Sequence, residues 1–146
     1  MKKTFLSIFF ILSAICLYFI YNYYTYDFAY TGDMKDGAPI PSPNGEYSAQ
    51  VYYENYGGAA GGVNLIVNII DHMKKDKEQT VYFSDAKGLP ILNWVEPNRL
   101  SIINRYGNSN RSTVIIIGKE IYDENGRSCG KYKIKKQFVC KDKNSK

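Results

Sequence analysis

The sequence is poor in the residues that build metal centres and histidine-based catalytic sites. It contains one histidine, His72, and three cysteines, and no second histidine or cysteine lies at metal-ligand spacing from it. A zinc site is therefore not expected, and no cofactor is expected either. A Ser–His–Asp triad could use only His72, and nothing in the sequence indicates a serine held against it. His72 is predicted to be an exposed residue in a charged connection.

The chain also lacks a nucleotide-binding motif, although it is locally rich in glycine. The stretch GGAAGG is followed by residues 63–65, which begin a strand, whereas a phosphate-binding loop leads into a helix through Lys and Ser or Thr. The stretch is either a tight or bulged connection between strands or a flat seat for another backbone. We expect the connection, with the alanines at the exposed tip of a hairpin. The residues of this candidate binding segment are Gly57, Gly58, Ala59, Ala60, Gly61 and Gly62.

One long apolar run is present, and it lies near the N-terminus. It extends from Phe5 to Tyr21, follows Lys2 and Lys3, and is nearly long enough to cross the hydrocarbon core of a bilayer. A cleaved signal peptide needs small residues before the cleavage site, but bulky aromatic residues follow this run. We therefore expect an uncleaved transmembrane anchor at residues 1–26, with the N-terminus in the cytoplasm and the rest of the chain outside.

Tyrosines gather at the outer end of the apolar run. The chain has 14 tyrosines, and several follow residue 17, where their rings suit the boundary between acyl chains and headgroups. Lipid attachment at Cys16 is disfavoured, because Ile15 before it is not small. Membrane lipid is thus an expected partner through the anchor. Nucleic acid is not expected as a partner of a domain outside the cell.

The remainder of the chain is interpreted as a linker and one β-rich domain. Residues 27–41 carry prolines and glycines without periodicity, which is typical of a linker. From 42 to 146, alternating and β-branched segments follow one another with short turns and no helix between them. This order predicts an all-β domain, a small antiparallel sandwich or curled sheet of about seven strands. The expected strands include 46–56, 63–71, 80–86, 91–95, 99–104, 113–122 and 131–140.

The C-terminal segment is basic and contains two cysteines. Within the expected last strand, Lys131, Lys133 and Lys135 share one face. They either form the solvated face of an edge strand or bind an anionic partner such as lipid headgroups or envelope polymer. Cys129 and Cys140 either form one disulfide, which an oxidising exterior favours, or remain reduced as small hydrophobic residues.

Several phrases of the sequence together resemble a known family. They are SPNGEYSAQVYYENYGGAAGGVNLIV, VYFSDAKG, and Trp94 with the later NRLSI, and they extend from Pro41 to Asn104. They are similar to small, uncharacterised, membrane-anchored proteins of Bacillus-type Gram-positive bacteria, which are known as a domain of unknown function. The resemblance implies an extracytoplasmic domain behind a single N-terminal membrane helix. It implies no activity and no catalytic residue.

Two classes of function remain open. The favoured one is not an enzyme but a membrane-anchored extracytoplasmic binding or structural module, which contacts envelope polymer, lipid or another membrane protein. The alternative is a small envelope hydrolase, because a pair of carboxylates about 5–9 Å apart cleaves glycosides. The hydrolase requires that acids from strand ends and turns converge in one concave site. The candidate acids are Asp71, Asp85, Glu96, Asp123 and Glu124.

Overall fold

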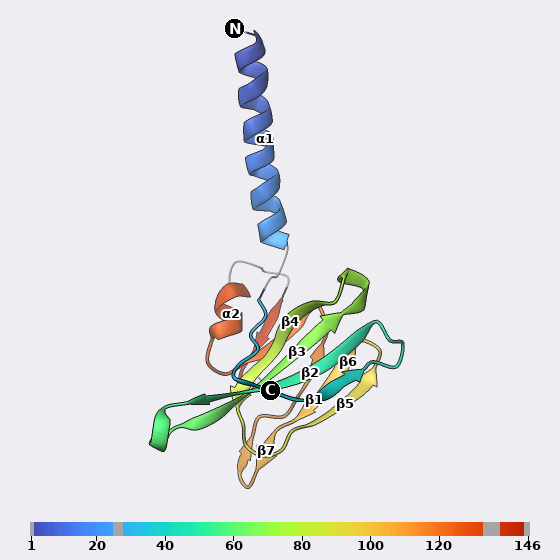
Figure 1. The fold of residues 1–146 in the computed structure, drawn as a ribbon, viewed down its shortest axis with the longest axis vertical. Coiled ribbons are helices and arrows are strands. Elements are labelled where there is room, and N and C mark those ends of the chain that lie inside the picture. Colours follow the sequence, from blue (N-terminus) through green and yellow to red (C-terminus); the bar gives the residue numbers. More distant parts are fainter. Residues whose placement is uncertain (1, 25–27, 133–137, 145–146) are drawn as a thin grey trace.

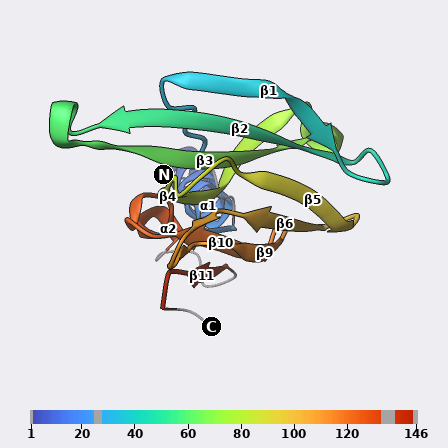
Figure 2. The ribbon, with the colours of Figure 1, turned by 90° about the horizontal axis from the view of Figure 1, so that it is seen from below.

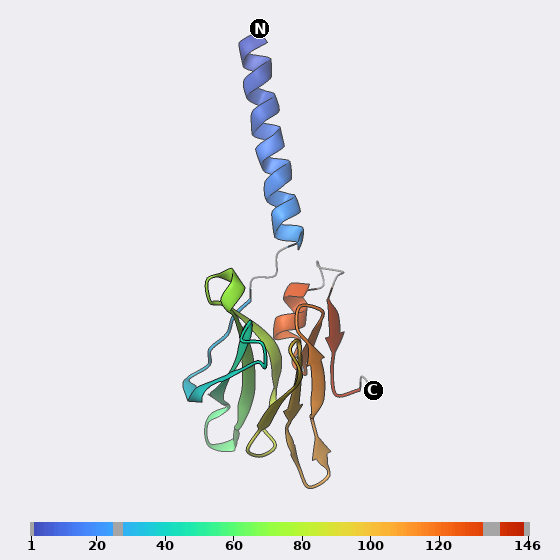
Figure 3. The ribbon, with the colours of Figure 1, turned by 90° about the vertical axis from the view of Figure 1, so that its right-hand side faces the viewer.

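A long N-terminal helix precedes a β-rich domain (Figure 1). The computed structural model describes residues 2–24, 28–132 and 138–144, and at 2–5, 22–24, 131 and 132 it describes the backbone alone. The helix α1 (Lys2–Tyr24) contains no glycine or proline and extends away from the β domain, as Figure 3 also shows. Within the part of the chain that the structure describes, no helix is long and apolar enough to cross a membrane. The expected transmembrane helix is therefore not confirmed.

Among the residues that the structure describes, the larger sheet has six strands in the order β1-β2-β3-β4-β10-β11. Their bounds are β1 (Met34–Pro41), β2 (Tyr47–Tyr56), β3 (Gly62–Asp71), β4 (Lys77–Asp85), β10 (Glu120–Asp123) and β11 (Val139–Lys141). Neighbours from β1 to β4 are antiparallel, whereas β10 is parallel to β4 and β11 is parallel to β10. Parallel neighbours need a crossover connection. Here the connection from β4 to β10 contains the second sheet (Figure 2).

The second sheet has three antiparallel strands and packs against one face of the larger sheet. Its strands are β5 (Ile91–Glu96), β6 (Arg99–Ile103) and β9 (Thr113–Ile116), and a small hairpin of β7 (Arg105–Tyr106) and β8 (Ser109–Asn110) lies between β6 and β9 in the chain. Alternate residues of each strand point to the shared core. The buried members of this core are Ala49, Val51, Leu65, Val67, Ile69, Val81, Tyr82, Leu100, Ile102, Ile115 and Tyr122.

The opposite face of the larger sheet is also partly covered. Tyr52, Ile66 and Phe83 form a smaller buried cluster, against which Tyr30 packs. The helix α2 (Arg127–Tyr132) begins over this face, where the Arg127 guanidinium lies 5.1 Å from the centre of the Phe83 ring. The nearly continuous apolar sequence of β3 suits a strand that is covered on both faces.

The fold prediction is confirmed only in its general class. The described residues are mostly β, but they form three sheets rather than one sandwich. Their strands, β1 to β11, are also more numerous than the seven or so that were expected. The segment 113–122 is two strands rather than one, because the chain turns at Gly118, whose φ is 78°. This turn takes the chain from the second sheet into the larger sheet, beside β4 and parallel to it.

Two further segments differ from their predictions. The segment 27–41, predicted to be a linker, contains β1, whose pairing with β2 is interrupted by an irregularity between Asp36 and Ile40. Its exposed side chains and its prolines suit an edge strand. The segment 131–140, predicted to be a strand, begins within α2, and its described part at the other end belongs to the short β11. The helix is favoured because Asp123 accepts the backbone N–H of Cys129.

Candidate functional site

A hairpin formed by β2 and β3 projects beyond the rest of the larger sheet. β1 pairs with β2 as far as Tyr53, and β4 pairs with β3 as far as Asn64. The hairpin arm, which we define as residues 55–63, extends past the ends of both neighbours (Figures 1 and 2). A two-stranded hairpin alone is marginally stable in water. The arm therefore depends on its turn and on the contacts at its base.

The turn of the hairpin arm requires its glycines for two different reasons. Gly57 and Gly58 have φ values of 77° and 60°, in the left-handed region that glycine adopts at low cost. Gly61 has an ordinary φ of −84°, but a Cβ at this position would overlap the carbonyl oxygen of Tyr56. The connection is thus tight as well as left-handed.

The tip of the hairpin arm is the short 3-10 helix η1 (Gly58–Ala60), and both of its alanines are exposed. The prediction that GGAAGG connects two strands, with Ala59 and Ala60 at the tip of a hairpin, is confirmed. This connection joins β2 to β3, the second and third strands of the observed sheet. Whether these residues also bind a partner stays a prediction.

The hairpin arm also carries an open cavity of about 430 Å³. Its lining residues are Asn55, Tyr56, Gly57, Gly58, Gly61, Gly62 and Val63. Because glycines form much of the lining, backbone groups reach the surface with few side chains in front of them. A seat for another backbone, the second interpretation of GGAAGG, would lie here.

Tyr56 connects the base of the hairpin arm to β4. Its hydroxyl donates to Oδ1 of Asp85 at 2.5 Å, and Asp85 also forms an ion pair with Lys87 at 3.0 Å. The hydrogen bond from Tyr56 lowers the pKa of Asp85 and raises the pKa of Tyr56. The carboxylate is therefore held in its charged form, and the arm is linked to a larger polar network.

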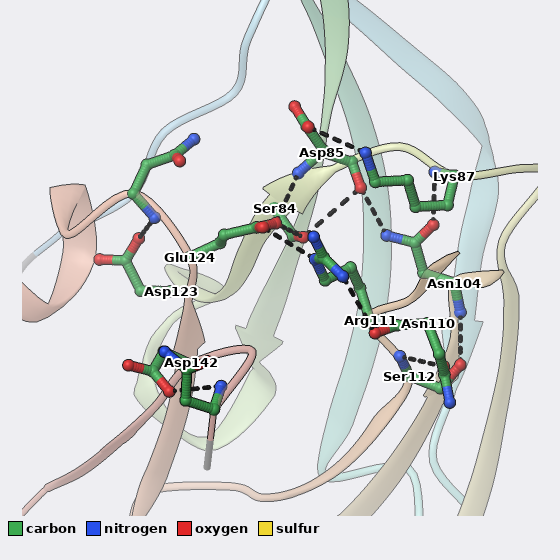
Figure 4. Close-up of polar contacts among 12 residues, drawn as sticks. Ser84, Asp85, Lys87, Asn104, Asn110, Arg111, Ser112, Asp123, Glu124 and Asp142 are labelled. Carbon is green, nitrogen blue, oxygen red and sulfur yellow. Dashed lines mark hydrogen bonds and ion pairs between the residues drawn. The ribbon is translucent and has the colours of Figure 1, made fainter. Parts of the chain in front are cut away.

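This polar network lies where β4 meets the end of β10 (Figure 4). Glu124 accepts a hydrogen bond from Ser84 Oγ at 2.6 Å and forms an ion pair with Arg111 at 2.8 Å. Burial alone would raise the pKa of Glu124, but the hydrogen bonds from Ser84 and Arg111 outweigh burial and lower it. The side chains of Arg111 and Glu124 are 19% and 10% exposed, so solvent screens this pair only weakly.

Asn104 extends the network to the second sheet. Its side chain is fully buried, and its amide nitrogen donates to the Tyr82 hydroxyl at 2.9 Å and to the Asp85 carbonyl at 2.8 Å. Its amide oxygen accepts the backbone N–H of Lys87 at 2.7 Å. Both donors of the buried amide and its oxygen are thus satisfied. The network thus links the second sheet to β4 of the larger sheet, near the end of β4 that lies beside the base of the hairpin arm.

The structure brings together two of the five candidate acids. Asp85 and Glu124 are neighbours, since the backbone N–H of Asp85 lies 3.4 Å from a Glu124 carboxylate oxygen. Both have lowered pKa values, whereas a glycosidase needs one carboxyl group that is protonated near neutral pH. The others have partners elsewhere: Asp71 pairs with Lys74, Glu96 with Arg99, and Asp123 with the N–H of Cys129.

The lowered pKa of Glu124 predicts how stability changes in acid. The ordinary pKa of this group is 4.5, and a folded-state pKa below it contributes stability above about pH 4.5 that is lost as pH falls through the folded value. We expect Glu124→Gln to be less stable at neutral pH and to lose less stability below pH 4.5. Urea unfolding across this range checks the prediction, with Glu96→Gln on the exposed part of β5 as the control. An unchanged acid dependence in Glu124→Gln would contradict it.

The C-terminal prediction is confirmed for the cysteines. Cys129 and Cys140 form a disulfide, with their Cα atoms 5.8 Å apart. Of the three candidate lysines, Lys131 lies in α2 rather than in a strand, and Lys133 and Lys135 lie outside the described residues. The basic strip stays a prediction.

Sequence reasoning did not identify Asn104 and Arg111 as site residues. Both belong to 104–112, which has the composition of a polar loop, and no local signal distinguishes a loop residue that is buried between sheets. In the described part of the chain, no group of three or more His, Cys, Asp or Glu side chains is placed to hold a metal ion.

Comparison with known proteins places the chain in a family without assigning an activity. Residues 1–126 match a family of unknown function, DUF5412, and the chain belongs to this family. No curated protein matches the chain. No solved structure matches it.

Proposed function

We propose that this protein is a binding or structural module, anchored in the cell membrane and displayed on its outer face, that engages its partner through the hairpin arm. The observation that carries the proposal is the arm itself, which projects past the sheet and presents an open, glycine-lined cavity. A projecting arm with an exposed tip contributes little to the core of its own domain, which supports a role in contacting a partner.

The exposed side chains of α1 support the membrane part of the proposal. Leu17 and Phe19 are 65% and 66% exposed, and the described side chains of the helix, at residues 6–21, are mostly apolar and exposed. Burying each such side chain contributes about 1.5–3 kcal/mol, which an apolar surrounding of lipid provides. Lys2 and Lys3 before the run favour a single-pass orientation with the N-terminus in the cytoplasm. The resemblance to small, membrane-anchored proteins of Bacillus-type Gram-positive bacteria implies the same orientation.

The disulfide supports an extracytoplasmic location for the β domain. Disulfides persist in oxidising surroundings and are rare in the reducing cytosol. The bridge between Cys129 and Cys140 joins α2 to the strand β11 and is therefore part of the folded domain.

The cavity of the hairpin arm is best suited to an extended segment of another protein. Its wall combines backbone groups of glycine with the aromatic Tyr56 and the partly exposed Val63. Extended peptides are commonly bound through backbone hydrogen bonds with a few side chains in shallow pockets. A second membrane or envelope protein is therefore the proposed partner, while the basic C-terminal residues would favour anionic lipid or polymer nearby.

A photo-crosslinking experiment in intact cells tests the proposal. A photoreactive residue at Ala60, on the tip, should capture a defined partner, whereas the same residue at Leu89, which is 91% exposed in another loop, should not. The captured species is identified by mass spectrometry. Equal capture from both positions, or capture from Leu89 alone, would count against the arm as the binding surface.

The proposed topology predicts the result of external proteolysis. Protease added to intact protoplasts should remove the β domain and leave only the N-terminal segment, because the domain is proposed to lie outside the membrane. An immunoblot with tags at either end measures which part survives. A full-length chain that survives in intact protoplasts but is cleaved after lysis would overturn the topology.

A further inference from the structure

Three polar side chains near the turn between β3 and β4 form a continuous chain of hydrogen bonds. Ser48 Oγ lies 2.8 Å from Nε2 of His72, and Nδ1 of His72 lies 2.6 Å from Oδ1 of Asp76. No sequence pattern indicated a serine against His72. The register of the sheet places one there, because Ser48 pairs with Ile70, two residues before His72.

The roles of the atoms in this chain follow for a neutral His72. An ionised carboxylate only accepts hydrogen bonds, so when Nδ1–H of the neutral imidazole donates to Asp76, Nε2 accepts from the Ser48 hydroxyl. The three groups then stand in the order nucleophile, base and orienting carboxylate. This order activates serine in unrelated folds, whatever the order of the residues in the chain.

The backbone around the three side chains holds them in place. Ser48 lies within β2, which has a paired strand on each side, and the N–H of His72 donates to the carbonyl of Glu46. Lys75 and Asp76 have φ values of 57° and 56°, which are uncommon for residues other than glycine. Backbone of this kind gathers at functional sites, and here it places the Asp76 carboxylate against the imidazole.

The exposure of the three residues limits the substrate. Ser48 is 6% exposed, whereas the side chains of His72 and Asp76 are 38% and 74% exposed. The imidazole is therefore open to solvent, whereas Ser48 is almost fully covered. A small acyl group fits this access better than a bulky one.

We propose that Ser48 is a nucleophile for acyl transfer from small carboxylic esters, with His72 as general base and Asp76 as a positioning residue. Ser48 Oγ forms a bond to the carbonyl carbon while its proton passes to Nε2 of His72. The bond to the alcohol then breaks, and the alcohol leaves with that proton. Water, deprotonated by His72 in the same way, releases the carboxylic acid and restores the serine.

This activity is separate from partner binding, because Ser48 lies at the opposite end of β2 from the hairpin arm. It is also distinct from glycoside cleavage by paired acids, since the reacting group is a hydroxyl. Failure of the proposed acyl transfer would therefore leave the proposed partner binding untouched, and the reverse also holds.

An alkyl fluorophosphonate tests the nucleophile, since such a probe phosphonylates an activated serine and releases fluoride. The full-length protein in detergent should gain one phosphonyl group, located at Ser48 by peptide mass spectrometry. His72→Gln should slow labelling about 100-fold or more, the usual contribution of a general base. Ser42→Ala is the matched control, because Ser42 is also buried but donates its hydroxyl to Asn44. It should label at the normal rate.

Asp76 is tested by a readout that loss of structure would not mimic. Asp76→Asn should lower the rate constant of bond formation and leave the concentration for half-maximal labelling unchanged, while Asp76→Glu should partly restore the rate. The effect should be smaller than that of His72→Gln, because the carboxylate is exposed. An unlabelled wild-type chain, an adduct at another serine, or full labelling of His72→Gln would overturn the proposal. The position of the adduct is read on the wild-type chain and does not depend on a variant's folding.

Discussion

Replacing Gly61 by alanine should lower the free energy of unfolding by about 3 kcal/mol, the upper part of the usual range for adding atoms to a packed site. The added Cβ would overlap the carbonyl oxygen of Tyr56 and lie 2.8 Å from the carbonyl carbon of Gly57. Both obstacles are backbone atoms, which cannot rotate away as a side chain would. The turn must open, and the last pair of the ladder between Tyr56 and Gly62 is lost with it.

Two other glycines serve as graded controls for this substitution. Gly58 has a φ of 60° but open space around a Cβ, so Gly58→Ala should cost only about 1–2 kcal/mol through the left-handed backbone. Gly130 lies in α2 with open space and no positive φ, so Gly130→Ala should be neutral or slightly stabilising. Urea unfolding of the full chain in detergent gives the three values. Equal stability of Gly61→Ala and Gly130→Ala would contradict the described turn.

Removing the disulfide by Cys129→Ser should also lower the free energy of unfolding by about 3 kcal/mol. The bridge joins residues that are 11 apart in sequence, and it restricts the unfolded chain more than the folded one. In the folded protein it holds α2 beside β11, where Cys129 and Phe138 pack against the buried Ile121.

Cys16→Ser is the matched control for the disulfide, because Cys16 is free and exposed on α1. It should leave the unfolding midpoint of the β domain unchanged. Addition of a reducing agent to the wild-type chain should reproduce the effect of Cys129→Ser and should have no further effect on that variant. A wild-type chain insensitive to the reducing agent would show that the bridge contributes no stability.

The sequence predicted the central part of the fold because the signals there are local. Alternation and β-branched residues marked β2 and β3, and the glycines between them marked the turn. The sequence did not indicate that Gly61, whose φ is ordinary, is also restricted, because its restriction comes from the neighbouring carbonyl of Tyr56.

Features that depend on distant parts of the chain were not predicted. The parallel pairing of β10 with β4 follows from a connection that passes through the whole second sheet. β1 is exposed along its length and contains prolines, so it has the composition of a linker and becomes a strand only by pairing with β2.

The polar sites show the same limit. Asn104 contacts Tyr82 and Asp85 across 22 and 19 residues of sequence, and Ser48 meets His72 across 24. These contacts are set by strand register, which a single sequence does not reveal. The sequence shows which polar residues are present, but it does not show which of them contact one another in the fold.

The central proposal is tested most directly by narrowing the cavity of the hairpin arm without disturbing the fold. Val63→Gln places a longer polar side chain in the cavity lining, and Ile91→Gln makes the same kind of change at an exposed position of β5 that does not line the cavity. In intact cells, the photoreactive residue at position 60 is used in each variant, and the amount of crosslinked partner is measured relative to the amount of folded chain. The proposal predicts a large loss of yield in Val63→Gln and normal yield in Ile91→Gln. Normal yield in both variants would contradict it.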